Sequence, residues 1–137
     1  MLNHGEVLSI DLFHKDPLPT HERITYLQGS SVSSEINDKV TKIVGENKKV
    51  LVILDSDHTR EHVEKELKIY SKFIRKGDLL IVEDTFLGGH PSHPEHGEGP
   101  TEAIEKFLQE NSEFYIDKTC EKFLFTLNYN GFLKRKD

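Results

Sequence analysis

The chain has 137 residues, enough for one domain with a modest hydrophobic core. Its formal net charge of −6 at pH 7 excludes a general electrostatic attraction to nucleic acid, and its single cysteine excludes an internal disulfide. No apolar run approaches the roughly 18 residues of a membrane span, and the first residues do not form a secretory signal. We therefore expect a single cytoplasmic domain over residues 1–137, with neither a nucleic-acid partner nor a membrane span.

Short strand-like runs alternate with segments of helical period along the chain. Each helix-like segment carries apolar residues three and four positions apart, as a helix with one buried face requires. Strands are expected at 6–12, 23–31, 49–54 and 78–82, with two more within 113–135, the second bent at Asn130 and Gly131. Helices are expected from Ser33 or Ser34 to Gly45, from 59 to 75 and from 101 to 110. This alternation predicts an α/β fold with a mostly parallel sheet.

The third and fourth strands, KVLVIL and DLLIV, are apolar without alternation, which is typical of strands buried on both faces of a sheet. In parallel sheets, ligands bind at the carboxyl ends of the strands. Three strands end in acids here: Asp11 closes the first, Asp55 and Asp57 follow the third, and Glu83 and Asp84 follow the fourth. The sequence therefore predicts a site at this edge of the sheet.

Asp57, Glu83 and Asp84 leave two strands that short right-handed crossovers would make neighbours. Carboxylates gathered in one place repel one another, and a divalent cation relieves that repulsion. Ligation by oxygen alone suits Mg²⁺, Mn²⁺ or Ca²⁺ better than Zn²⁺. The same acids could instead cap a helix and stabilise turns, so both interpretations stay open.

The segment HTREH, residues 58–62, matches the H-x-x-E-H pattern of one class of zinc hydrolases. His58 and His62 would then be ligands one helical turn apart, and Glu61 would be the base. However, His58 falls in the turn ahead of the expected helix, and the sequence identifies no third ligand. A zinc hydrolase is therefore an alternative to the oxygen-ligated cation.

A loop rich in glycine, proline and histidine, residues 86–100, follows the fourth strand and its acids. It carries His90, His93 and His96. Long loops in compact domains often cover active sites, which favours a lid or a substrate-binding loop. A surface loop that binds metal only adventitiously is the alternative, and the role of residues 88–99 stays open.

The chain resembles the cephalosporin hydroxylase and rhamnosyl O-methyltransferase family over most of its length, from VLSIDL to the C-terminus. The resemblance rests on VLVILDSDHTREHVEKELKIYSKFIRKGDLLIVEDTFLGGHP, GEGPTEAIEKFL and FLFTLNYNGFLKR. It implies the Rossmann-like three-layer sandwich of methyltransferases that depend on S-adenosylmethionine (SAM). It also implies methyl transfer, assisted by Mg²⁺ or Mn²⁺, to a hydroxyl of a sugar, glycolipid or secondary metabolite, as in lipid or polysaccharide biosynthesis.

The resemblance also implies a set of metal ligands. Asp57, Glu83 and Asp84 match the ligands of the family, and Asp55 is the less favoured alternative to Asp57. The related catechol enzymes have a lysine three positions after the metal aspartate, where this chain has Arg60. Because a guanidinium is too basic to accept a proton at neutral pH, no residue is assigned as the general base.

For the cosubstrate, the resemblance implies three contacts. Asp11 matches the acid that holds the ribose hydroxyls of SAM, Ser31 falls where the adenine is contacted, and His58 would lie close to the cosubstrate. Methyltransferases of this fold also have a first strand and a glycine-rich turn, which have no counterpart ahead of Asp11. The resemblance therefore implies a methyltransferase fold that lacks its first, central strand.

Two functional classes follow from these observations. The first is an O-methyltransferase with a small-molecule or sugar substrate. The second is a non-catalytic remnant or partner subunit, an α/β module that binds a metal or another ligand. An unpaired central strand edge leaves backbone groups without partners, which favours a homo-oligomer or pairing with a chain that supplies the strand.

Overall fold

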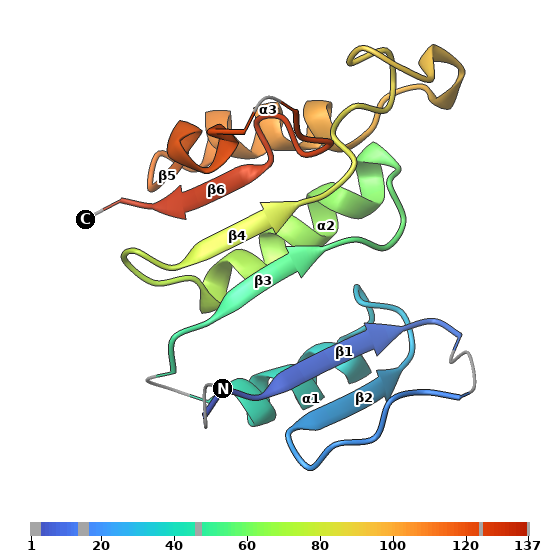
Figure 1. The fold of residues 1–137 in the computed structure, drawn as a ribbon, viewed down its shortest axis with the longest axis vertical. Coiled ribbons are helices and arrows are strands. Elements are labelled where there is room, and N and C mark those ends of the chain that lie inside the picture. Colours follow the sequence, from blue (N-terminus) through green and yellow to red (C-terminus); the bar gives the residue numbers. More distant parts are fainter. Residues whose placement is uncertain (1–3, 14–16, 46–47, 124, 137) are drawn as a thin grey trace. The chain divides into compact units, whose positions relative to one another are not determined.

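The structure is a computed structural model that describes residues 4–13, 17–45, 48–123 and 125–136 (Figure 1). The chain forms two compact units, Met1–Ile43 and Val44–Asp137. Each unit has its own sheet. The expectation of a single domain over residues 1–137 stays a prediction.

The first unit contains two parallel strands, β1 (Val7–Asp11) and β2 (Ile24–Gln28), and the helix α1 (Ser34–Val44). Both strands and the helix are confirmed, although each strand is shorter than the sequence suggests. The hydroxyl oxygen of Ser33 accepts the backbone N–H of Ile36 at 3.3 Å, which is the helix cap expected at this position. Ile36 itself is 2% exposed, in agreement with its place on the apolar stripe of α1.

The second unit contains a four-stranded sheet with the strand order β3-β4-β6-β5. Its strands are β3 (Leu51–Leu54), β4 (Leu79–Val82), β5 (Phe114–Ile116) and β6 (Phe132–Arg135). Strands β3 and β4 are parallel, whereas β6 runs antiparallel to both of its neighbours. The parallel pair therefore presents the carboxyl ends of β3 and β4 at one edge of the sheet.

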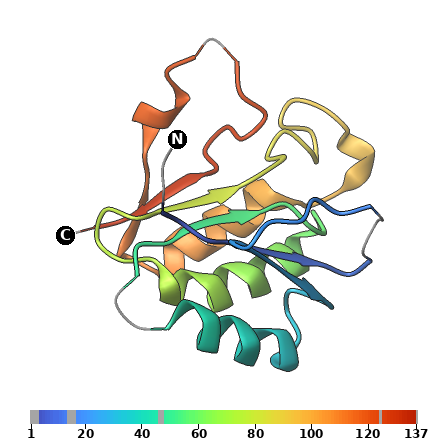
Figure 2. The same ribbon diagram turned by 60° about the horizontal axis from the view of Figure 1, so that its bottom comes forward.

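The core of this unit lies between the sheet and two helices, α2 (Arg60–Tyr70) and α3 (Pro100–Glu110). The helices pack against each other, and Figure 2 shows both on one face of the sheet. Leu67 of α2, Leu80 of β4 and Leu133 of β6 are each 0% exposed. Burying a leucine side chain contributes about 1.5–3 kcal/mol, so the burial of these three residues stabilises this core. None of the described helices is both long enough and apolar enough to cross a bilayer.

The expectation that the third strand is buried on both faces is wrong. Leu51 and Ile53 expose 58% and 53% of their surface, whereas Leu54 is 5% exposed. Strand β3 is the end strand of its sheet, and only one of its faces meets the core. An unbroken apolar run therefore does not distinguish a strand covered on both faces from an apolar edge strand.

Two element boundaries also differ from the expectation. Helix α2 ends at Tyr70 and is followed by a 3₁₀ turn, Ser71–Phe73. Ile74, after this turn, has an extended backbone (φ −81°, ψ 124°) and is 0% exposed. The last strand begins at Phe132, after the Asn130 turn, rather than bending through it.

Candidate metal centre

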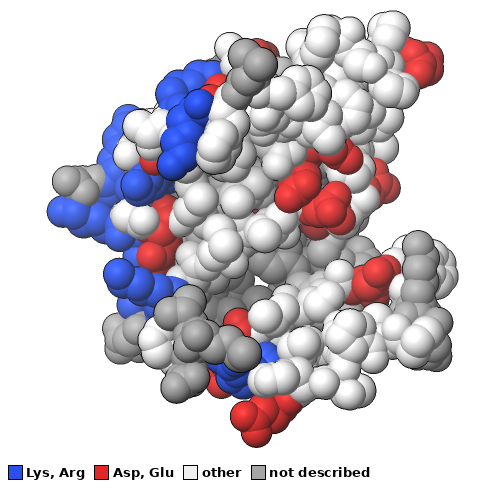
Figure 3. All heavy atoms as spheres, viewed as in Figure 1, with Lys and Arg blue, Asp and Glu red and all other residues white. Residues whose placement is uncertain are grey.

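The carboxyl ends of β3 and β4 bring acidic side chains from two parts of the chain together. Leu54 and Val82 are partners in the parallel register, and the backbone N–H of Glu83 donates to the Leu54 carbonyl oxygen at 3.0 Å. Asp55 therefore leaves β3 beside the point where Glu83 leaves β4. Figure 3 shows acidic side chains gathered over these ends and basic side chains over the opposite ends of the same sheet.

Asp55, His58 and Asp84 form a compact group in which the candidate ligand atoms all lie within 4.8 Å of one another. The ring nitrogen Nε2 of His58 lies 3.4 Å from Oδ1 of Asp55 and 3.5 Å from Oδ2 of Asp84. This nitrogen is buried and has no hydrogen-bond partner within the described part of the chain. A buried polar atom without a partner, next to two carboxylates, is an arrangement suited to a ligand.

Glu83 belongs to the same electrostatic neighbourhood. Burial raises the pKa of its carboxyl group, and the charges of Asp55 and Asp84 raise it further. A hydrogen bond with the side chain of Asn128 and the proximity of His58 act in the opposite direction. The carboxylates of Asp55, Glu83 and Asp84 thus lie within electrostatic range, whereas the sequence favoured Asp57 in place of Asp55.

Asp84 has a left-handed backbone conformation, with φ +53°. Side chains alternate between the faces of a strand, and Leu80 and Val82 point into the core. Continued alternation would direct Asp84 into the core as well. The left-handed residue breaks the alternation, Asp84 becomes half-buried at the site, and Thr85, 1% exposed, occupies the core instead. Aspartate tolerates this conformation better than most residues do.

Asp57 lies apart from the Asp55 group. Its Oδ1 atom accepts the backbone N–H of Thr59 at 2.9 Å, in the turn that leads into α2. Hydrogen bonds from Thr59 lower the pKa of the Asp57 carboxyl group, with smaller contributions from His62 and His58. The assignment of Asp57 as a metal ligand stays a prediction, and the structure brings Asp55 into the group with Asp84.

The HTREH segment is divided between two places in the structure. His58 precedes α2 and joins the carboxylates, whereas His62 lies on α2 with its Nε2 atom 3.5 Å from Oε1 of the buried Glu66. Glu61 is exposed. Neither His62 nor Glu61 belongs to the one group of potential metal ligands found among the described residues.

The histidines of the loop after β4 also lie outside that group. His90 Nε2 lies 2.6 Å from Oε1 of Glu102 on α3, and the ring of His93 packs edge-on against Phe86. His96 lies in a 3₁₀ turn, Pro94–His96, and is exposed.

The end of this loop is tied to the start of α2. The backbone N–H of Arg60 donates to the Glu98 carbonyl oxygen at 3.3 Å, and Arg60 Nη1 lies 2.6 Å from Glu98 Oε2. A Cβ atom at Gly99 would lie 3.3 Å from the His58 carbonyl oxygen, so the loop backbone packs closely beside His58. The loop is therefore held next to the candidate metal centre, and its role as a lid stays a prediction.

In the first unit, Asp11 and Ser31 lie near the carboxyl ends of β1 and β2. Asp11 is exposed. Its Oδ1 atom accepts a hydrogen bond from the backbone N–H of Phe13 at 2.9 Å, and its carbonyl oxygen accepts one from the backbone N–H of Gly29. Ser31 is half-buried in the turn ahead of α1. Their cosubstrate contacts stay predictions.

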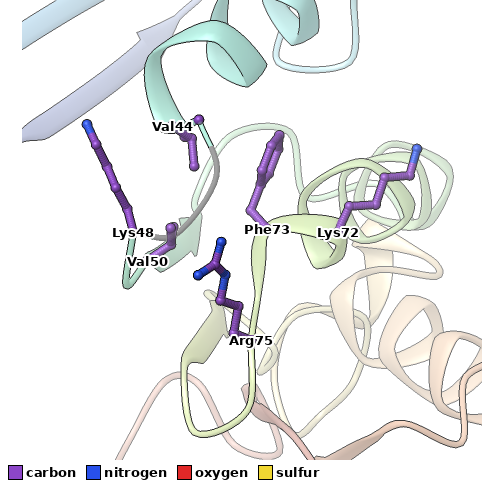
Figure 4. A pocket seen from close by; sticks show the side chains of 7 residues that line it. Val44, Lys48, Val50, Lys72, Phe73 and Arg75 are labelled. Atoms are coloured by element: carbon purple, nitrogen blue, oxygen red, sulfur yellow. The ribbon is translucent and has the colours of Figure 1, made fainter.

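A cavity of about 160 Å³ lies at the other end of β3 (Figure 4). Lys48, Val50, Lys72 and Arg75 contribute to its lining. Val50 precedes β3, whereas Asp55 follows it, so this cavity is separate from the carboxylates.

Residues 1–136 match the family model described as rhamnosyl O-methyltransferase/CmcI. Among curated proteins, the rhamnosyl O-methyltransferase of Mycobacterium leprae (strain TN) is 38% identical over 136 residues, covering 96% of this chain and 59% of the relative. That of Mycobacterium tuberculosis (strain ATCC 25618 / H37Rv) is also 38% identical over 136 residues, covering 95% and 56%. The chain thus spans less than two thirds of the length of these relatives.

Solved methyltransferase structures have a fold similar to that of this chain. The MycE methyltransferase of the mycinamycin biosynthetic pathway, in complex with Mg and S-adenosylhomocysteine (SAH), superposes with a TM-score of 0.62 at 18% identity, covering 96% of this chain and 37% of the other. Its complex with Mg, SAH and mycinamycin VI gives a TM-score of 0.60 at 17% identity, covering 96% and 36%. The fold is therefore the Rossmann-like fold of methyltransferases, and the chain belongs to the rhamnosyl O-methyltransferase/CmcI family.

Proposed function

We propose that this chain is an O-methyltransferase that transfers a methyl group from SAM to a hydroxyl of a small acceptor, assisted by Mg²⁺ or Mn²⁺. The observation that carries the proposal is the meeting of Asp55, His58 and Asp84 at the carboxyl ends of β3 and β4. The family and the Mg and SAH in the MycE complexes support it. The names of the relatives support a sugar hydroxyl as the acceptor, on a glycolipid or secondary metabolite.

The side chains at the candidate centre fit a divalent cation. Asp55 and Asp84 place carboxylate oxygens within 4.8 Å of each other, and Glu83 adds a third carboxylate within electrostatic range. Oxygen donors suit Mg²⁺ and Mn²⁺. We assign Asp55, Glu83 and Asp84 as the residues that hold the cation, and Asp57 stays the alternative to Asp55.

The chemistry joins the acceptor oxygen to the methyl carbon while the bond between that carbon and sulfur breaks. When bound, SAM supplies the electrophilic methyl group and the cation polarises the acceptor hydroxyl. We assign Nε2 of His58 as the atom that receives the hydroxyl proton. It has no hydrogen-bond partner among the described residues, and it lies 3.4 Å from Oδ1 of Asp55 and 3.5 Å from Oδ2 of Asp84, beside the residues assigned to the cation.

For the cosubstrate, we assign Asp11 to the ribose hydroxyls and Ser31 to the adenine. Asp11 offers an exposed carboxylate at the carboxyl end of β1, a position at which sheets of this class hold a ribose. Ser31 lies in the turn that follows β2, the strand paired with β1. We also propose that His58 lies close to the cosubstrate, because the acceptor hydroxyl and the methyl group of SAM must meet for transfer.

The apolar edge of β3 supports association with a second chain. Leu51 and Ile53 are exposed on the end strand of the sheet, and such a strand can pair with another. We therefore propose a homo-oligomer or a partner chain that pairs with this edge. Light scattering over a concentration series would give a mass above 15.8 kDa if the proposal holds.

The experiment that tests the proposed function follows labelled methyl groups from SAM to a rhamnoside, in Mg²⁺ and in excess chelator. The proposal predicts transfer that requires Mg²⁺ and that is lost in Asp84→Asn, because asparagine keeps the backbone conformation but removes the charge. The control variant Asp38→Asn changes an exposed acid on α1 and should transfer normally. Transfer that persists in chelator would contradict metal assistance. Metal binding without any transfer would instead support the non-catalytic module.

A further inference from the structure

The segment between β5 and β6 returns to the end of β4. The hydroxyl of Thr85 donates to the Leu127 carbonyl oxygen at 3.2 Å, and the backbone N–H of Val82 donates to the Gly131 carbonyl oxygen at 2.8 Å. These two hydrogen bonds hold residues 127–131 beside Glu83 and Asp84, the two acids that follow β4.

Asn128, within this stretch, contacts both of those acids. Its Oδ1 atom accepts the backbone N–H of Asp84 at 3.1 Å. Its side chain also lies near the Glu83 carboxyl group, and it lowers the pKa of that group. One amide group therefore accepts from the backbone of Asp84 and lies near the carboxyl group of Glu83, the residue before it.

Hydrogen bonds on both sides hold the backbone of the turn that carries Asn128. The backbone N–H of Asn128 donates to the Thr126 hydroxyl oxygen at 3.1 Å, and its carbonyl oxygen accepts the backbone N–H of Gly131 at 2.9 Å. A Cβ atom at Gly131 would overlap the Val82 carbonyl oxygen, so only glycine permits this close approach. The amide of Asn128 is thus presented to Glu83 and Asp84 by a backbone fixed on both sides.

We propose that Asn128 is a positioning residue that holds Asp84 in its left-handed conformation and turns Glu83 and Asp84 toward Asp55. This inference rests on the proposed function, because the carboxylates matter as the ligands of a cation. Asp84 is the residue at which the side-chain alternation of β4 is broken, and it is also the residue whose backbone N–H donates to Asn128. Removing a residue that forms a hydrogen bond with a metal ligand typically weakens metal binding about 10- to 100-fold.

The test compares metal binding by the full chain and by four variants. Mn²⁺ affinity is measured by electron paramagnetic resonance of the free ion, and the geometry of bound Co²⁺ is followed by its visible absorption. Asn128→Ala should bind Mn²⁺ about 10-fold or more weakly and should alter the Co²⁺ spectrum. Asn111→Ala is the matched control, because Asn111 caps the end of α3 through the Phe107 carbonyl oxygen. It should bind both ions as the wild type does.

Asn128→Gln keeps an amide group of the same charge but moves it by one methylene relative to the Asp84 N–H. It should therefore retain the fold by circular dichroism and still alter the Co²⁺ spectrum, which decides the question if Asn128→Ala unfolds. Unchanged Mn²⁺ affinity and Co²⁺ spectra in folded Asn128 variants would overturn the inference. If Asp84→Asn also left binding unchanged, the proposed metal centre itself would be wrong, so the two failures are distinguishable.

Discussion

Asp55 and Asp84 leave two neighbouring parallel strands and meet at one ring nitrogen, His58 Nε2, at 3.4 Å and 3.5 Å. The two aspartates come from β3 and β4, whose register places Leu54 opposite Val82. Their proximity thus follows from the sheet and not from a single motif. This relationship is the basis for assigning the metal ligands and the proton acceptor.

Replacing His58 by glutamine should reduce methyl transfer by about 10²- to 10⁴-fold, the range typical of a lost general base. Mg²⁺ affinity should stay near the wild-type value, because the carboxylates that hold the cation are unchanged. His62→Gln is the control, since His62 lies beside Glu66 and outside the group. Loss of Mg²⁺ affinity in His58→Gln would mean that the imidazole is a ligand rather than the proton acceptor.

Leu133→Ala should destabilise the fold by about 2–5 kcal/mol, as expected when a buried leucine is truncated. Leu133 is 0% exposed and pairs with Leu80 of β4 and Ile116 of β5. Leu127→Ala, at a residue that is 45% exposed, is the control and should change the free energy of unfolding much less. Urea denaturation followed by circular dichroism measures both, and equal effects would contradict the proposed core.

Asp117→Asn should destabilise the protein at neutral pH but not in acid. Hydrogen bonds from Thr119 and the Lys134 ammonium group hold the pKa of the Asp117 carboxyl below its usual 3.8. A pKa depressed by folding adds stability above the unfolded-state pKa, and this stability is lost as pH falls through the folded-state pKa. The difference in free energy of unfolding between wild type and variant should therefore be constant near pH 7 and shrink below about pH 4. A difference that does not change with pH would contradict this.

Glu98→Gln should loosen the loop after β4 with little effect on overall stability. The ion pair between Arg60 and Glu98 is partly exposed, and such pairs contribute at most about 1 kcal/mol. Backbone amides of residues 88–99 should exchange faster with solvent, as hydrogen exchange with mass spectrometry would show. Glu95→Gln, at an exposed residue of the same loop, should not change exchange. Equal protection in both variants would mean that the ion pair does not restrain the loop.

The order of strands and helices follows from local pattern, and most of it was predictable. The stripe of α2, for instance, places Val63, Leu67 and Tyr70 at helical spacing, and all three are buried. The exposed face of β3 was not predictable, because Leu51 and Ile53 are as apolar as Leu54. Which faces of a strand are buried depends on the position of the strand in the sheet, and local sequence patterns do not predict that position.

The details of the site depend on geometry over longer distances. The resemblance favours Asp57 over Asp55 as the metal ligand, but Asp55 directly continues β3, whereas by Asp57 the chain has turned toward α2. The position immediately after the strand is the signal that favours Asp55. No local pattern indicates the left-handed Asp84 or its contact with Asn128, 44 residues further along the chain.

The most direct test of the metal centre is calorimetric titration of Mg²⁺ into the wild type, Asp55→Asn and Asp57→Asn. Each variant loses one carboxylate from the same turn, so the pair controls for charge. The assignment of Asp55, Glu83 and Asp84 predicts that Asp55→Asn loses Mg²⁺ binding and that Asp57→Asn retains it. Retained binding in Asp55→Asn together with loss in Asp57→Asn would contradict the ligand set, and absence of binding in the wild type would contradict the metal centre.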